Sequence, residues 1–207
     1  MVFCCIVTNT YFCFRSAELV KARITSVPSL REAGTARGLH PVSIHTGDPE
    51  AFFHPTDAVN ERYEELMENP RWSFYGPQFP SPEQLLEARN RVFARHPNTT
   101  FVSLHMGWPE NLDWAHMLDQ YPNVMVEFGA REAELGRQPR QTREFVLKYQ
   151  DRIMFGTDNG MDEVMYRNHF RWLETADEYF DYWGYPAQGR WKIYGLDLTR
   201  CWKRSIT

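Results

Sequence analysis

The fold is decided by a short stretch, TFVSLHMG at residues 100–107, in which a β-branched and apolar run ends in a histidine and then a glycine. Short runs of this kind, bounded by turn-forming residues, predict buried β-strands. Three other stretches share the pattern and complete a set of predicted strands: HPVSIH at 40–45, NVMVEF at 123–128 and RIMFGTD at 152–158.

Helical patterns lie between these strands. The segment SPEQLLEAR at 81–89 begins with Ser81 as N-cap and Pro82 at the first helical position, followed by Gln84, and predicts a helix that runs to Arg95. Further helices are predicted over 60–67, 110–120, 139–150 and 163–182, and in part over 16–37, where Pro28 must interrupt the helix or begin a new one. The alternation of strand and helix predicts an α/β fold of parallel βα units in one domain.

The composition excludes several classes of protein. With 43% hydrophobic and 24% charged residues among 207, wholesale disorder is excluded. The net charge is −4 and basic residues do not cluster, which argues against nucleic-acid binding. No stretch approaches the roughly 20 apolar residues of a membrane helix, and the apolar residues 1–14 lack the basic start of a secretory signal. The cysteines have no metal-site spacing and predict no disulfide scaffold, so we expect a reducing, cytoplasmic compartment.

Three of the predicted strands end in a side chain that can bind a metal, each followed two residues later by glycine. These side chains are His45, His105 and Asp158. In parallel βα folds the loops after the carboxyl ends of the strands build the site, and glycine there permits a sharp turn. Two imidazoles and a carboxylate suit a divalent ion such as zinc, which activates a bound water, while a nearby carboxylate or an unligated imidazole moves the proton.

Other polar residues have simpler interpretations. A single histidine at a strand end is usually structural, so the metal hypothesis depends on the three matched ends. Arg131 follows the strand at 123–128. It either belongs, with Glu134 and Arg137, to a solvated helix start with salt bridges, or binds an anionic group of the substrate. Asp48 and Asp57 are assigned surface or capping roles. Structural roles are also assigned to His40, His54, His96, His116 and His169.

Four segments in order resemble one enzyme family: PVSIHTGDP (41–49), FVSLHMG (101–107), YPNVMVE (121–127) and DRIMFGTD (151–158). Over residues 35–198 the chain resembles the amidohydrolase-related (amidohydrolase 2) metal-dependent hydrolases, a TIM-barrel family similar to the aminocarboxymuconate-semialdehyde and resorcylate decarboxylases. The resemblance implies that His45 ends the fifth barrel strand as a metal ligand. It implies that His105 ends the sixth as a ligand or acid/base, and that Asp158 ends the eighth, binding metal and taking a proton from water.

The sequence departs from that family in two ways. It contains no His-x-His pair, which the family carries on its first strand, and it is shorter than the roughly 250 residues of a full barrel. We therefore expect a partial TIM barrel over 35–198 with its last four strands, flanked by atypical segments at 1–34 and 199–207, and weak zinc binding in this chain.

Two functions remain open. One is a metal-dependent hydrolase or non-oxidative decarboxylase acting on a small, carboxylated or cyclic substrate. The other is a truncated, inactive fragment or pseudoenzyme that lacks the His-x-His clamp. Exposed barrel edges would favour a homo-oligomer in either case. An unrelated α/β binding module is disfavoured because the sequence has no glycine-rich phosphate loop.

Overall fold

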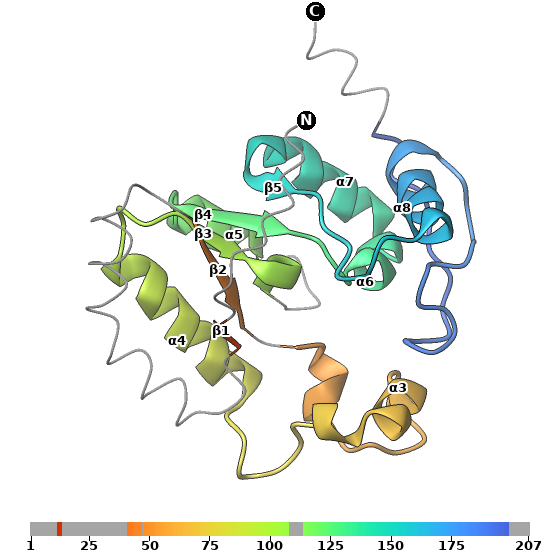
Figure 1. The fold of residues 1–207 in the computed structure, drawn as a ribbon, viewed down its shortest axis with the longest axis horizontal. Coiled ribbons are helices and arrows are strands. Elements are labelled where there is room, and N and C mark those ends of the chain that lie inside the picture. Colours follow the sequence, from red (N-terminus) through yellow and green to blue (C-terminus); the bar gives the residue numbers. More distant parts are fainter. Residues whose placement is uncertain (1–11, 14–40, 47, 108–113, 199–207) are drawn as a thin grey trace, which may run out of the picture.

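The computed structural model describes residues 12–13, 41–46, 48–107 and 114–198, and it places five parallel strands in one sheet (Figure 1). The strands follow the chain in order: β1 (Phe12–Cys13), β2 (Val42–His45), β3 (Phe101–Ser103), β4 (Val124–Glu127) and β5 (Ile153–Met154). Each strand pairs in parallel with the next. The predicted α/β class with four parallel strands is confirmed, and β1 is a fifth that the sequence did not indicate.

Helices connect the strands, as parallel pairing requires. The connection from β2 to β3 holds α3 (Tyr63–Glu68) and α4 (Pro82–Arg95), with the short 3₁₀ turns η1 (Glu50–Phe53) and η2 (Pro70–Trp72). After β3 come η3 (Leu104–Gly107) and α5 (Trp114–Gln120), and β4 is followed by α6 (Glu132–Gly136), α7 (Pro139–Lys148) and η4 (Gln150–Arg152). The last helix is α8 (Glu163–Glu174). The helix expected over 16–37 lies outside the described residues, as does the start of the one expected over 110–120.

The start of α4 has the capping geometry that the sequence predicts. The Ser81 hydroxyl accepts the backbone N–H of Gln84 at 3.3 Å, and the Gln84 side-chain oxygen accepts the N–H of Ser81 at 3.0 Å. The helix ends at Arg95, as predicted, and buries Val92 and Phe93 against the sheet side of the core.

Replacement of Ser81 by alanine is expected to lower the free energy of unfolding by about 1 kcal/mol, because the backbone N–H of Gln84 loses the hydroxyl that caps it. Urea denaturation would measure the change. The matched control is Ser81→Thr, which keeps the hydroxyl and is expected to retain most of the stability. Equal losses in both variants would show that the cap is not what stabilises this end of the helix.

The predicted helix at 163–182 ends early. Thr175 closes α8, because its hydroxyl donates to the carbonyl of Arg171 at 2.9 Å and accepts the N–H of Asp177 at 3.2 Å. Side-chain bonds of this kind compete with helix continuation. Beyond them Phe180 leaves the helical path and pairs antiparallel with Ile193.

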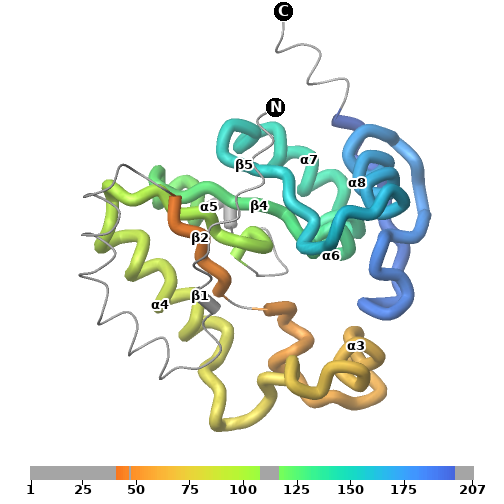
Figure 2. The backbone as a smooth tube through the Cα atoms, viewed as in Figure 1, coloured from red at the N-terminus to blue at the C-terminus, as the bar shows by residue number. Residues whose placement is uncertain are grey.

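The core lies between the sheet and the helices that cover it. Val124 and Val126 of β4 are fully buried, and Phe128 meets Trp172 of α8 edge to face with ring centroids 5.6 Å apart. Figure 2 shows residues 50–80 extending away from the sheet toward the segment after α8. An ion pair between Arg190 and Glu64 joins these two parts of the chain, and a second one joins Arg62 to Glu134 of α6.

Candidate functional site

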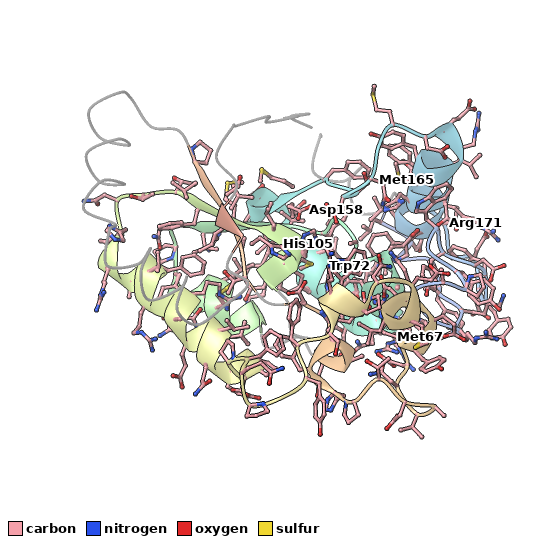
Figure 3. All side chains as sticks on the ribbon, turned by 60° about the horizontal axis from the view of Figure 1, so that its bottom comes forward. Met67, Trp72, His105, Asp158, Met165 and Arg171 are labelled. Carbon is pink, nitrogen blue, oxygen red and sulfur yellow. The ribbon has the colours of Figure 1, made fainter. Side chains whose placement is uncertain are left out.

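The three predicted site residues lie where parallel strands end. His45 is the last residue of β2, His105 follows β3 within η3, and Asp158 comes four residues after β5. Because neighbouring parallel strands run in the same direction, their carboxyl ends share one edge of the sheet. Figure 3 shows His105 and Asp158 at this edge, where both lie against Gly129.

The two histidines approach each other closely. Their ring centroids are 4.9 Å apart and the rings are nearly perpendicular, at 87°. Two imidazoles bound to one tetrahedral zinc ion, with Zn–N bonds of about 2 Å, place their centroids about 5 Å apart. The centroid spacing of His45 and His105 is thus the one that two ligands of a single ion would have, and it is also that of an ordinary edge-to-face ring contact.

The hydrogen bond of the His105 ring fixes its tautomer. Nδ1 lies 2.8 Å from the carbonyl oxygen of Gly129, which can only accept a hydrogen bond, so Nδ1 carries the proton. In the neutral ring Nε2 then keeps its lone pair and is the nitrogen suited to bind a metal or accept a proton.

A left-handed turn carries His105 away from β3. His105 has a φ of 53° and Met106 a φ of 56°, and Gly107 continues the turn with a φ of 74°. Buried Arg89 of α4 donates to the carbonyl of Gly107 at 2.7 Å, and a Cβ at Gly107 would overlap this guanidinium. Burial also lowers the pKa of Arg89 to about 10. Gly107 thus has the role expected of it, a turn and a close approach.

The other two glycines of the pattern differ. Gly47 lies outside the described residues. Gly160 has open space around the position of a Cβ, and the left-handed conformation belongs instead to Asp158, with a φ of 57°. The sharp turn after β5 is therefore made by the aspartate itself.

Glu127, the last residue of β4, also belongs to the site. Its Oε1 accepts the backbone N–H of His105 at 2.5 Å, and its Oε2 accepts that of Gly129 at 2.6 Å. No role was predicted for it, since it does not follow the pattern of a ligand before a glycine. Its place at a strand end was the one signal in the sequence.

The third predicted ligand does not complete a metal centre. The Asp158 side chain is exposed, and nowhere in the described ranges are three His, Cys, Asp or Glu side chains grouped to hold an ion. The structure brings the rings of His45 and His105 together, but Asp158 does not form a group of three metal ligands with them. The assignment of all three to a metal therefore stays a prediction.

Arg131 is fully buried at the start of α6. Its Nη1 lies 3.5 Å from Glu134 Oε2, and both side chains are almost without solvent exposure. The salt bridge agrees with one of the two alternatives from the sequence, but the solvated helix start expected with it is wrong, because Arg131 and Glu134 are both buried. A substrate anion would reach the guanidinium only after this pair opened, so a role in substrate binding also stays a prediction.

Comparison with known proteins places the chain in a family. The family model described as "Amidohydrolase" matches residues 35–202. The chain belongs to the amidohydrolase family. A crystal structure described as an uncharacterized TIM-barrel protein, Bb4693 from Bordetella bronchiseptica, is similar to it at 18% sequence identity and a TM-score of 0.31.

This match covers 69% of the amidohydrolase-family chain and 50% of the Bordetella protein, so the chain spans half the length of that relative. Curated proteins gave no match. Among the described helices of this amidohydrolase-family protein, none is both long and apolar enough to cross a membrane.

Proposed function

We propose that this chain carries part of the active site of a metal-dependent hydrolase or non-oxidative decarboxylase, with His45 and His105 holding a divalent ion, zinc by preference. The observation that supports this most is the 4.9 Å approach of the two rings at the carboxyl edge of parallel strands. Membership of the amidohydrolase family supports the reaction class.

We also propose that β2 to β5 correspond to the last four strands of a TIM barrel. Their sequential parallel order supports this, because each barrel strand pairs with the next one along the chain.

The residues divide the chemistry between them. A divalent ion at the histidine pair would supply Lewis-acid activation of water or of a carbonyl or carboxylate group. Asp158, exposed at the same edge, is suited to take a proton from water, and Nε2 of His105 is the alternative acid/base. A small carboxylated or cyclic substrate remains the expected class.

A non-catalytic role is the second candidate. The sequence contains no His-x-His pair, and the described part of the chain holds no group of three ligands. Two imidazoles alone bind zinc less tightly than the three protein ligands of catalytic zinc sites. A member of the family that has lost turnover would show this arrangement.

Zinc titration of the metal-free chain, followed by calorimetry, tests the proposal. We expect one weakly bound ion, with affinity reduced at least about tenfold in His45→Ala and in His105→Ala, because each change removes one of two imidazole ligands. The control is His54→Ala, which removes a surface histidine that lies 3.6 Å from Glu50. Equal affinity in all four proteins, or no binding by any, would reject the metal site.

A further inference from the structure

The carboxylate of Glu127 lies where three strand-end loops meet. It bonds the N–H groups of His105, after β3, and Gly129, after β4. A Cβ at Gly129 would lie 2.7 Å from Glu127 Oε2, and one at Gly156, two residues before Asp158, would overlap the same oxygen. Because Gly129 and Gly156 have no side chains, there is room between them for the carboxylate of Glu127.

The turn that Glu127 holds is unfavourable by itself. His105 and Met106 are consecutive residues with side chains in the left-handed conformation, which is strained for any residue except glycine. Hydrogen bonds to an ionised carboxylate are about twice as strong as neutral ones. The bond from the His105 N–H to Glu127 therefore helps to offset the cost of the turn.

The same carboxylate also reaches the His105 ring through the backbone of one residue, Gly129. Glu127 binds the N–H of Gly129, and the carbonyl of Gly129 accepts from Nδ1 of the ring at 2.8 Å. Glu127 Oε1 also lies 3.8 Å from this Nδ1. Backbone and ring of His105 are thus both held by contacts that include Glu127.

We infer that Glu127 is a positioning residue, which fixes the tautomer and direction of the His105 ring so that Nε2 faces the site; the inference rests on the proposed function. Groups that orient a ligand in this way typically change metal affinity by 10- to 100-fold when they are replaced. Glu127 would act through His105 and would not contact the ion.

The test is Glu127→Gln in the full chain. The amide keeps the shape of the side chain, but its nitrogen cannot accept, so one of the two N–H groups loses its partner. ¹⁵N-histidine NMR of the metal-free protein at about pH 8, where imidazole is ordinarily neutral, reports the tautomer directly. For His105 we expect the Nδ1–H tautomer alone in the unmodified chain and a mixture of the two tautomers in the variant. We also expect the variant to bind Co²⁺ with an affinity about 10- to 100-fold lower than the unmodified chain.

The matched control is Glu87→Gln, which removes a surface carboxylate whose ion pair with Arg91 is loose at 3.7 Å. It should leave both readouts unchanged. If Glu127→Gln does not fold by circular dichroism, Gly129→Ala displaces the carboxylate while keeping its charge, and the same mixture of tautomers is expected.

A folded variant with a single Nδ1–H tautomer and unchanged Co²⁺ affinity would overturn the inference. A mixture of tautomers in a protein whose unmodified form binds no metal would support the positioning role and reject the proposed function. The experiment can therefore reject the positioning role of Glu127 and the proposed metal-dependent function independently of each other.

Discussion

Replacement of Glu134 by glutamine is expected to lower the free energy of unfolding by about 3–5 kcal/mol, the cost of breaking a buried ion pair by removing one partner. Glu134 lies between two buried arginines: Oε1 accepts from Arg62, and Oε2 lies 3.5 Å from Arg131. Arg62 also bonds Glu65 at 3.0 Å. Without the Glu134 charge, buried Arg131 would lose this carboxylate, and buried Arg62 would keep its bond to Glu65.

Urea denaturation near neutral pH measures this loss. The control is Glu163→Gln, because Glu163 pairs with Arg167 in the same acidic–basic arrangement, but both side chains are 76% exposed. Exposed pairs of this kind contribute less than about 1 kcal/mol. Similar losses in the two variants would show that burial does not make the Glu134 cluster important for stability.

Replacement of Glu132 by glutamine is expected to remove a pH dependence of stability. Burial raises the pKa of Glu132 to about 7, against an ordinary value of 4.5. The folded chain keeps a proton that the unfolded chain releases above its ordinary pKa. This contribution is therefore complete below about pH 4.5, falls as the pH rises, and is lost above about pH 7, a change of about 3 kcal/mol.

The measurement of stability against pH must take into account a second titratable group next to Glu132. Oε2 accepts the backbone N–H of Trp183 at 3.2 Å and lies 3.9 Å from Nδ1 of His169 on α8. Burial lowers the pKa of His169, so its own contribution has the opposite sign and rises as the pH increases through its ordinary range. Because the two groups are in contact, Glu132→Gln is compared with its parent both in the unmodified chain and in a His169→Asn background, which removes the histidine contribution.

We expect Glu132→Gln to match the unmodified chain near about pH 4.5 and to exceed its stability by up to about 3 kcal/mol near about pH 8. Thermal or urea denaturation across this range gives the difference directly. A constant difference at every pH would mean that Glu132 does not titrate between the folded and unfolded states. His169→Asn in the same background would then show whether the histidine carries the pH dependence.

Local patterns were enough to predict much of the fold. The four apolar runs became β2 to β5, and the cap at Ser81 and the end at Arg95 placed α4 correctly. Both features depend on residues close together in the chain, where periodicity and capping chemistry act. The end of α8 was predicted wrongly because Phe180 finds its partner at Ile193, and such long-range pairing leaves no periodic signal.

For the candidate site as well, some features could be predicted from the sequence and others depend on the tertiary structure. The positions of His45, His105 and Asp158 at strand ends follow from the sequence, since each follows an apolar run. Their distances do not: the two histidines are 60 residues apart in number yet have rings 4.9 Å apart, while Asp158 remains outside their pair. Strand order and the left-handed turn at His105 decide this.

By itself the sequence determined the α/β class, the family and the edge of the sheet where the candidate site lies, because apolar runs, caps and strand-end residues are local. Only the tertiary structure showed that Glu127 reaches His105 across two loops and that Arg62 meets Glu134, 72 residues away, in the buried interior. Carboxylates and guanidinium groups are normally solvated, so nothing in the sequence marks them for burial. They become essential to stability where folding removes the water around them, because a buried carboxylate then depends on a buried guanidinium group for its stabilisation, and the reverse.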